Sequence, residues 1–352
     1  MIRILTVVGA RPQFIKAAPL SLEMQRRGTI EEISVHTGQH FDENMSGIFF
    51  RDLKLPSPRY NLGISGGTHG VMTGRMLEAI EKILLDEKPD MMLVYGDTNS
   101  TLAAGLAAAK LNIPVAHVEA GLRSFNRAMP EEINRVMVDH VSELLLCPTA
   151  TAINHLATEG ITSGVHLVGD LMFDAVLALS DAADRTSTIH ADLGLERKRY
   201  AAATIHRAEN TDSKERLEAV IEYTLDQANG LDVVLPLHPR TRQSAERLSV
   251  NLDRKGLRLV DPLGYLDMLV LSKGAAMIFT DSGGLQKEAY FHRVPCVTLR
   301  DETEWTETLD AGWNRLWTVP EYKARREISD YGTGNSAGSI VDILEAYGTG
   351  EN

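Results

Sequence analysis

The sequence predicts an α/β protein made of two Rossmann-like domains, each a doubly wound parallel sheet, that face each other across a cleft. The chain has 352 residues, which is too long for one ordinary core and suits two cores of roughly 150 residues each. Short apolar runs alternate with helical patterns along most of the chain, as expected for parallel strands buried on both faces. We expect domains at residues 1–170 and 171–336, then a helix at 337–352 that could pack across either domain.

The first domain begins with a β-branched run at residues 2–8 that ends in the turn Gly9-Ala10-Arg11-Pro12. Such a run followed by a turn is typical of a parallel strand, and a helix is expected next, at residues 13–27. The same reading predicts strands with their turns at 33–40, 90–97, 114–119 and 144–148, and helices at 71–87, 98–110 and 131–140. Pro130 suits the first turn of the last of these helices.

The second domain repeats this alternation after a linker that we place at residues 169–193, where an Ala- and Leu-rich helix leads into a polar stretch. Apolar runs predict strands at 201–206, 233–238, 257–260 and 277–280, with a run at 294–300 that closes the series. Helices are expected at 215–228, at 265–271 and, last of all, at 337–347.

Composition narrows the classes of partner. The formal net charge of −12 argues against nonspecific binding to nucleic acid or to an anionic membrane. The two cysteines, Cys147 and Cys296, each lie in an apolar run, so we expect buried free thiols in a reducing, cytoplasmic protein. The first residues lack the apolar region of a signal peptide, and no apolar run reaches 18 residues.

Polar side chains follow nearly every predicted strand. Ligands of doubly wound sheets bind beyond the carboxyl ends of the strands, so these side chains nominate a site. They are Arg11, Gln39, His40, Asp97, Glu119, His206, His238, Arg240, Asp281, Ser282 and Arg300.

The junction Ser282-Gly283-Gly284, between the strand at 277–280 and a following helix, is typical of an anion site. Two glycines there expose backbone N–H groups at the positive end of the helix dipole, where phosphate binds readily. Glu288 follows about one and a half turns later, near where the ribose of a bound nucleoside diphosphate would lie. The alternative is that the glycines only allow tight packing of the strand on the helix.

Cations are expected close to that anion. Arg11 lies in the first turn of the chain and Lys16 follows it on the first helix, while His206-Arg207 opens the second domain. Guanidinium groups hold phosphate oxygens in a fork, so a leaving diphosphate is a suitable partner. Surface salt bridges and a hydrogen-bonded structural histidine are the plain alternatives.

Three carboxylates, Asp97, Glu119 and Glu131, form a candidate acid–base set in the first domain. Carboxylates that are partly withdrawn from water can act as general acids or bases. Asp97 could instead be a helix N-cap, and Glu131 an ordinary first-turn acid. No Gly-x-Gly-x-x-Gly follows the first strand, which disfavours a nicotinamide cofactor. His117 with Glu119, or His36 with His40, lacks a third ligand at zinc spacing, so we expect no metal.

In these motifs the chain resembles the non-hydrolysing UDP-N-acetylglucosamine 2-epimerases over nearly its whole length. The resemblance lies in Gly9-Ala10-Arg11-Pro12, in residues 118–123 (Val-Glu-Ala-Gly-Leu-Arg), in residues 130–135 (Pro-Glu-Glu-Ile-Asn-Arg) and in Asp281-Ser282-Gly283-Gly284. It implies a GT-B type fold and inversion at C2 of a UDP-sugar, by elimination of UDP to a glycal and re-addition, without NAD or metal. A UDP-sugar substrate, UDP, domain closure and a homodimer are further implications.

By match to the family motifs, Asp97, Glu119, Glu131 and His206 are expected to be catalytic. The resemblance places substrate contacts at the cations Arg11, Lys16, Arg123, Arg127, Arg135 and Arg207, and at Tyr265, Met268, Ser282, Gly283, Gly284 and Glu288. Within this set His206 would stand beside the β-phosphate, Glu288 would bind the ribose, and residues 265–268 would cover the uracil.

The chain departs from the best-known members at Ala10, at Gln13-Phe14, and in the loop at 124–129, which replaces a longer one. It departs again in residues 206–210 and 300–305. These variants are similar to the branch that acts on UDP-2,3-diacetamido-2,3-dideoxyglucuronic acid, whose sugar carboxylate would need a cation such as Arg127. Residues 39–44 depart from members that bind a second substrate molecule as activator.

Two other functions share the predicted nucleotide-binding half. A GT-B glycosyltransferase would transfer the sugar to an acceptor and form no epimer when the acceptor is absent. A catalytically silent UDP-sugar sensor would bind UDP without turnover, so replacing Asp97 would change no rate.

Overall fold

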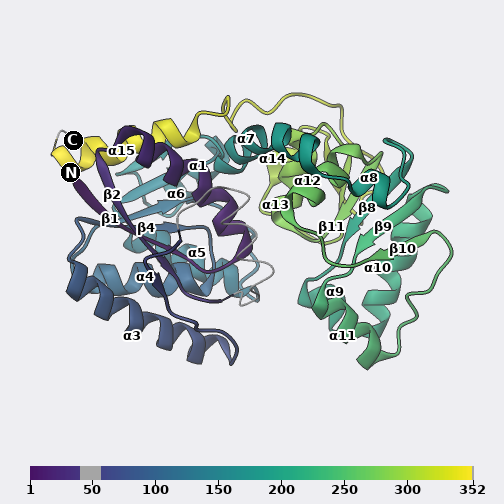
Figure 1. Cartoon of the computed structure of the whole chain (residues 1–352), viewed down its shortest axis with the longest axis horizontal. Coiled ribbons are helices and arrows are strands. Elements are labelled where there is room, and N and C mark those ends of the chain that lie inside the picture. The colour runs from purple at the N-terminus through teal and green to yellow at the C-terminus, as the bar shows by residue number, and fades with distance from the viewer. Residues whose placement is uncertain (40–56, 351–352) are drawn as a thin grey trace. The chain divides into compact units, whose positions relative to one another are not determined.

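The computed structural model describes residues 1–39 and 57–350. The chain forms two compact units (Figure 1). Unit 1 comprises Met1–Leu177 together with Ser329–Asn352, and unit 2 comprises Ala178–Ile328. Each unit is built around its own parallel sheet.

The sheet of unit 1 has seven strands in the order β3-β2-β1-β4-β5-β6-β7, and every neighbouring pair is parallel. The order reverses between β1 and β4, which is the switch point where α/β sheets bind ligands. The strands are β1 (Ile2–Val8), β2 (Ile30–His36), β3 (Tyr60–Asn61), β4 (Met91–Tyr95), β5 (Val115–Val118), β6 (Leu144–Cys147) and β7 (Val165–Leu167).

Helices cover both faces of this sheet, and a separate apolar cluster lies on each face. The helices are α1 (Arg11–Arg27), α3 (His69–Glu87), α4 (Asn99–Lys110), α5 (Pro130–Val141), α6 (Ala150–Thr158), α7 (Leu171–Thr186, which continues into unit 2) and α15 (Ser336–Thr349). Helix α4 is rich in alanine and carries Gly105, where an added Cβ would lie 3.5 Å from the side chain of Val138. Small side chains therefore let α4 and α5 pack closely.

The last helix, α15, belongs to unit 1 although unit 2 precedes it in the chain. It runs beside α1, with both chain ends at the same side of unit 1 (Figure 1). Ile340 and Leu344 are fully buried in the same apolar cluster as α1. Gly348 lies so close to β1 that a Cβ there would meet Cδ1 of Ile2 at 2.3 Å. Arg27 adds ion pairs to Asp342 and Glu345.

The sheet of unit 2 has six parallel strands in the order β10-β9-β8-β11-β12-β13. They are β8 (Tyr200–Thr204), β9 (Asp232–Pro236), β10 (Leu257–Val260), β11 (Met277–Thr280), β12 (Cys296–Thr298) and β13 (Asn314–Leu316). The helices are α8 (Ile189–Asp192), α9 (Ala208–Thr211), α10 (Lys214–Gln227), α11 (Pro239–Leu248), α12 (Tyr265–Gly274), α13 (Gly283–Phe291) and α14 (Thr306–Asp310). Here the order reverses between β8 and β11.

Two parallel-sheet α/β units confirm the predicted fold class. The strand at 294–300 does not close the second series, because β13 pairs with β12 at the edge of the sheet. The chain also returns to unit 1 at residue 329, earlier than the predicted end of the second domain at 336. Two hydrogen bonds explain this return: the backbone N–H of Asp170 donates to the carbonyl of Tyr331, and that of Ala150 donates to the side-chain carboxylate of Asp330. Among residues 1–39 and 57–350, no helix combines the length and apolar character needed to cross a membrane.

The buried position of Leu344 predicts that α15 stabilises unit 1 in particular. Leu344→Ala should lower the free energy of unfolding by about 2–5 kcal/mol, because it leaves a cavity in a closed core. Cys147 in unit 1 and Cys296 in unit 2 are both buried, so thiol labelling in denaturant reports on each unit separately. Labelling of Cys147 should accelerate while that of Cys296 stays unchanged.

Leu22→Ala on α1 is the matched control, because Leu22 is 41% exposed. Equal acceleration at both thiols in the Leu344 variant would contradict the assignment of α15 to unit 1.

Candidate active site

Helix α5 holds Asp97, which follows β4, at the carboxyl ends of the strands of the unit 1 sheet. The guanidinium of Arg135 pairs with the Asp97 carboxylate, with Nε 3.2 Å from Oδ2. The side chain of Asn134 donates to the carbonyl of Asp97 at 2.8 Å. Arg135 is almost fully buried, whereas the Asp97 side chain stays 30% exposed. The carboxylate is thus fixed in position but remains open to a ligand.

Glu119, which follows β5, has an unusual backbone conformation. Its φ of +70° lies in the left-handed region, which non-glycine residues rarely adopt except where surrounding structure imposes it. Its carboxylate forms an ion pair with Lys16 of α1. A Cβ added at Gly96 would lie 3.3 Å from Oε2 of Glu119 and 3.9 Å from Nζ of Lys16. The ends of β4 and β5 therefore bring Glu119, Lys16 and the Gly96-Asp97 turn together.

Glu131 lies in the first turn of α5, the same helix that supplies Arg135. Its neighbour Glu132, which the sequence analysis did not single out, is buried and accepts backbone N–H groups of Ser124 and Phe125, each at 2.9 Å. Burial alone would raise the pKa of Glu132, but these hydrogen bonds and the charge of Arg135 lower it. Glu132 therefore anchors the loop at 124–129 to α5 as an anion.

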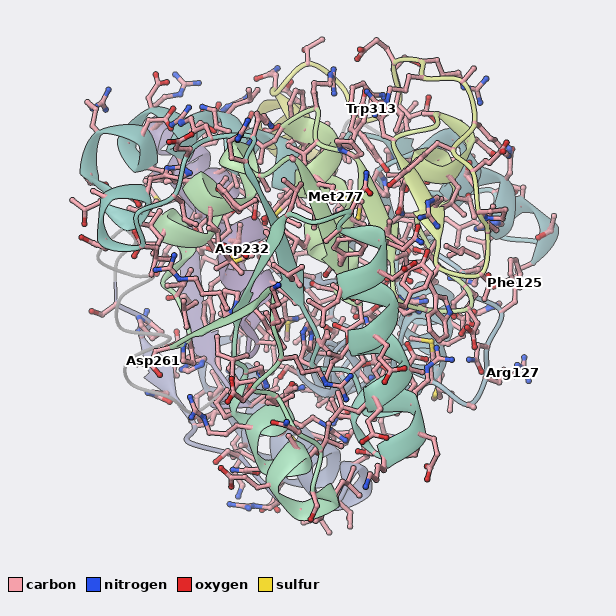
Figure 2. The ribbon with its side chains drawn as sticks, turned by 90° about the vertical axis from the view of Figure 1, so that its right-hand side faces the viewer. Phe125, Arg127, Asp232, Asp261, Met277 and Trp313 are labelled. Carbon is pink, nitrogen blue, oxygen red and sulfur yellow. The ribbon has the colours of Figure 1, made fainter. Side chains whose placement is uncertain are left out.

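The predicted arginines of this region differ in exposure. Arg123 is buried, and its guanidinium is engaged by Asp139 at 2.7 Å and by both oxygens of Glu159 at 2.6 and 2.8 Å. This geometry favours an anchoring role over direct contact with a ligand. Arg127 is exposed, and Figure 2 shows it at the outer edge of the loop beside Phe125. Within residues 1–39 and 57–350 its guanidinium has no hydrogen bond or ion pair.

A small pocket opens beside the Lys16–Glu119 pair. It is also lined by Pro148, Gly169 and Asp170. Asp170 is buried and caps the start of α7 by accepting the N–H of Met172 at 2.7 Å. Asp170 follows the end of β7 and precedes a helix, so it fits the pattern of polar residues after strand ends. It was missed because β7 was not predicted.

In unit 2 the buried carboxylate of Asp281, which follows β11, organises the end of β8. Its Oδ2 accepts the backbone N–H groups of His206 and Arg207 at 2.8 and 2.9 Å and the side chain of Asn210 at 3.0 Å. Its Oδ1 lies 3.2 Å from Nδ1 of His206. Asp281 is fully buried while His206 is 36% exposed. The Nδ1 edge of the ring therefore lies against the buried carboxylate, while part of the imidazole stays exposed.

The Ser282-Gly283-Gly284 turn leads from β11 into α13 as predicted. The first N–H groups of a helix have no partner within the helix, so the turn can accept an anion. Gly283 leaves no room for a larger residue, because a Cβ would lie 2.6 Å from Oε1 of Glu304 and 3.1 Å from Nε1 of Trp305. These two residues approach the turn from a loop that was noted only for its departure from the family pattern.

Glu288 and Tyr265 come together in the interior of unit 2. The Tyr265 hydroxyl donates to Oε1 of Glu288 at 3.2 Å, and both side chains are nearly buried. Met268, on the same helix as Tyr265, is half-buried against an apolar cluster of unit 2. Lys287 of α13 is fully buried with Nζ 3.8 Å from the centre of the Trp305 ring. A carboxylate, a phenol and a buried cation therefore surround the first turns of α13.

The other strand-end residues serve mainly to hold the fold. Gln39 accepts from the backbone and hydroxyl of Ser100, Arg240 pairs with Asp212, and Arg300 is buried against Glu304. His238 caps α11, with its ring 5.3 Å from that of His206. His40 and the side chain of Arg11 lie outside the described part of the chain.

The described residues of unit 1 place carboxylates beside a lysine and an arginine. This arrangement is suited to proton transfer. Those of unit 2 present a helix N-terminus beside an oriented imidazole, which is suited to binding a phosphate group.

The chain is similar to known proteins over nearly its whole length. Residues 22–350 match the family model of UDP-N-acetylglucosamine 2-epimerase. A "UDP-N-acetylglucosamine 2-epimerase homolog" of Methanococcus maripaludis is 51% identical over 359 residues, covering 97% of this chain and 99% of that protein. The UDP-2,3-diacetamido-2,3-dideoxy-D-glucuronate 2-epimerase of Pseudomonas aeruginosa is 49% identical over 353 residues, covering 99% and 96%.

A solved structure is similar over the same length. The UDP-GlcNAc 2-epimerase of Methanocaldococcus jannaschii, in complex with UDP-GlcNAc and UDP, matches with a TM-score of 0.91 at 42% identity. The match covers 97% of this chain and 99% of that one.

The tight surroundings of Gly283 predict that Gly283→Ala weakens the binding of UDP, the expected ligand. The added methyl group must displace Glu304 or Trp305, and overpacking of this kind costs about 1–3 kcal/mol, or roughly a 5- to 150-fold rise in Kd. Calorimetric titration with UDP measures the change.

Gly74→Ala in α3 is the matched control, because a Cβ there meets nothing within 4 Å. Unchanged UDP affinity in the Gly283 variant would show that this turn does not hold the ligand.

Proposed function

Because the chain belongs to the UDP-N-acetylglucosamine 2-epimerase family, we propose that it interconverts UDP-N-acetylglucosamine and UDP-N-acetylmannosamine without hydrolysis. One structural observation supports the proposal in addition to family membership. Unit 1 clusters carboxylates with Lys16 and Arg135, and unit 2 joins an anion-binding turn to the oriented His206. Inversion next to a departing diphosphate needs both kinds of group.

The chemistry explains why both are needed. The C2 hydrogen of an N-acetylhexosamine is not adjacent to a carbonyl carbon, so direct deprotonation is very difficult. When the C1–O bond breaks, UDP leaves with the bonding electron pair, and the developing positive charge acidifies C2–H. A carboxylate takes that proton and a C1=C2 double bond forms, giving a glycal and UDP. Re-addition of UDP to C1, with protonation of C2 from the opposite face, gives the epimer and balances every atom and electron.

In this proposal the carboxylates of unit 1 exchange the C2 proton. Asp97, Glu119 and Glu131 supply the acid–base groups, and Arg135 and Lys16 hold the first two in place. Fixed geometry supports catalysis because no reorganisation is then needed at the moment of reaction.

Unit 2 would retain UDP through both halves of the reaction. The turn at Ser282-Gly283-Gly284 takes the diphosphate, and His206 and Arg207 face its charge. Glu288, with the hydroxyl of Tyr265, binds the ribose, and residues 265–268 cover the uracil. A diphosphate held by several groups at once remains available as the returning nucleophile.

The proposal predicts incorporation of solvent deuterium at C2. With UDP-N-acetylglucosamine in D2O and no acceptor, proton NMR should show loss of the C2 proton and appearance of the manno epimer. Asp97→Asn should slow this exchange by about 100-fold or more, the usual contribution of an acid–base group. UDP binding by calorimetry should persist in that variant.

Asp232→Asn, at an exposed position of β9, is the control and should keep full turnover. Absence of C2 exchange with either candidate UDP-sugar would refute the epimerase. Sugar transfer that requires an acceptor would indicate a glycosyltransferase, and UDP binding without any turnover would indicate a sensor.

A second candidate substrate is UDP-2,3-diacetamido-2,3-dideoxyglucuronate, on which a relative 49% identical to this chain is named to act. The exposed guanidinium of Arg127, in the loop that Glu132 anchors, has no partner among the described residues and could accept the sugar carboxylate. An Arg–carboxylate pair is strong when it is bidentate.

Arg127→Ala therefore tests the substrate. If the uronic acid is the substrate, the variant should lose about tenfold or more in kcat/KM for it, since hydrogen bonds to charged groups contribute about 1.5–3 kcal/mol. It should change little for UDP-N-acetylglucosamine. Arg26→Ala, an exposed arginine of α1, is the control, and equal losses on both sugars would remove Arg127 from consideration.

The remaining parts of the proposal follow from family membership. We propose a homodimer that acts in the cytoplasm, where charged nucleotide sugars are retained, and that supplies precursors of a surface polysaccharide such as an O-antigen or capsule. Sedimentation velocity would reveal the dimer, and a monomer at working concentration would contradict it.

A further inference from the structure

His117, in the middle of the unit 1 sheet, makes two hydrogen bonds that no role described so far explains. Its side chain is fully buried on β5. Nδ1 lies 2.7 Å from Oδ1 of Asp139 on α5, and Nε2 lies 2.7 Å from the carbonyl oxygen of Gly96 at the end of β4. Both nitrogens are thus occupied, which also leaves no lone pair for a metal ion.

The two partners determine how many protons the ring carries. A carbonyl oxygen only accepts hydrogen bonds, so Nε2 must donate. The other Asp139 oxygen, Oδ2, accepts from Arg123 at 2.7 Å and from the N–H of Gly121 at 3.2 Å. Burial alone would raise the pKa of Asp139, but the hydrogen bonds and charges of His117 and Arg123 lower it. The guanidinium and the N–H that donate to Oδ2 favour the ionised carboxylate without any contribution from His117, so Oδ1 accepts and Nδ1 must donate as well.

Groups on the neighbouring elements are consistent with a buried positive ring. Arg123 and Asp139 form a compact ion pair beside it, and Glu159 neutralises the other side of Arg123. The Lys16–Glu119 pair lies at the same strand ends. Cys147, on the adjacent strand β6, stays neutral because burial raises the pKa of its thiol to about 12.

The ring connects the backbone segments that carry two of the candidate catalytic carboxylates. Its Nε2 holds the carbonyl of Gly96, whose φ is +59°, and Asp97 is the next residue. Glu119 follows His117 by two residues and adopts a φ of +70°. Asp139 in turn holds the N–H of Gly121, where a Cβ would lie 2.4 Å from the carbonyl oxygen of Ala152.

We propose that His117 is a positioning residue that stays doubly protonated and, through Gly96 and Asp139, fixes Asp97 and Glu119 for proton transfer. The proposal rests on the proposed function in taking these two carboxylates as the reacting groups. A neutral imidazole could donate only one of the two hydrogen bonds, and a shorter amide side chain cannot span both partners. Loss of the ring would free the left-handed turns at Gly96 and Glu119.

Nitrogen NMR tests the protonation state without any reference to activity. With 15N-labelled histidine, the ring of His117 should show protons on both nitrogens, because each nitrogen donates to an oxygen. Exposed histidines such as His140, 48% exposed, provide the reference signals, and His117→Asn assigns the resonance. A single ring proton on His117 would overturn the proposal.

Turnover tests the positioning role. His117→Asn should lower kcat by about 10- to 100-fold, because small displacements of reacting groups have effects of this size, while KM and UDP affinity change less than about twofold. Asp139→Asn removes the negative charge and one of the two acceptor oxygens beside the ring. It should have the same effect with the ring retained, and it serves as the test if His117→Asn fails to fold. His166→Asn, on β7 of the same sheet, should have full activity.

The outcomes separate this proposal from the proposed function. A wild-type protein without C2 exchange would refute the epimerase, while the NMR result would still decide the state of His117. An active wild type whose folded His117→Asn or Asp139→Asn variant keeps kcat within about twofold would overturn the positioning role. Equal losses in kcat and in UDP affinity would also overturn it, because they indicate general unfolding.

Discussion

One buried aspartate in each unit accepts several hydrogen bonds at once, and the geometry of the candidate site depends on these two carboxylates. Asp281 receives two backbone N–H groups and an asparagine amide, and Asp139 receives an arginine, a histidine and a backbone N–H. An ionised carboxylate without partners inside a protein costs several kcal/mol. Each aspartate therefore also fixes the groups that donate to it. Several of these donors, such as Gly121 and His206, lie just after strands of the two sheets.

The same constraint explains the unusual backbone of unit 1. Glycine adopts left-handed conformations without steric cost, as at Gly96 and Gly121, but Glu119 does so with a full side chain. Its neighbours compensate, since His117 is fixed on one side, Gly121 on the other, and Lys16 engages its carboxylate. A strained residue at a strand end, supported from three directions, is a preorganised group rather than a flexible one.

The two units divide the chemistry in a way that follows from their local structure. Unit 1 joins opposite charges in close pairs, Lys16 with Glu119 and Arg135 with Asp97, and so keeps its carboxylates oriented. Unit 2 relies on the dipole of α13, with Glu288 about one and a half turns further along the helix. Chain order does not follow this division, because α15 packs on α1 after unit 2 is complete.

The sequence by itself determined the fold class, most strands and the ends at which polar groups gather. Runs such as residues 144–147 and 277–280 are apolar because both faces of a parallel sheet are buried, so their position shows in the pattern alone. β3, β7 and β13 have only two or three residues and were not predicted, whereas the equally short β12 lies inside the longer run at 294–300. Only the tertiary structure decided which polar residue touches which. Arg123 meets Glu159 and Asp281 meets His206 across 36 and 75 positions of chain, and hydrogen bonds of that span depend on how strands and helices pack, which local sequence does not encode.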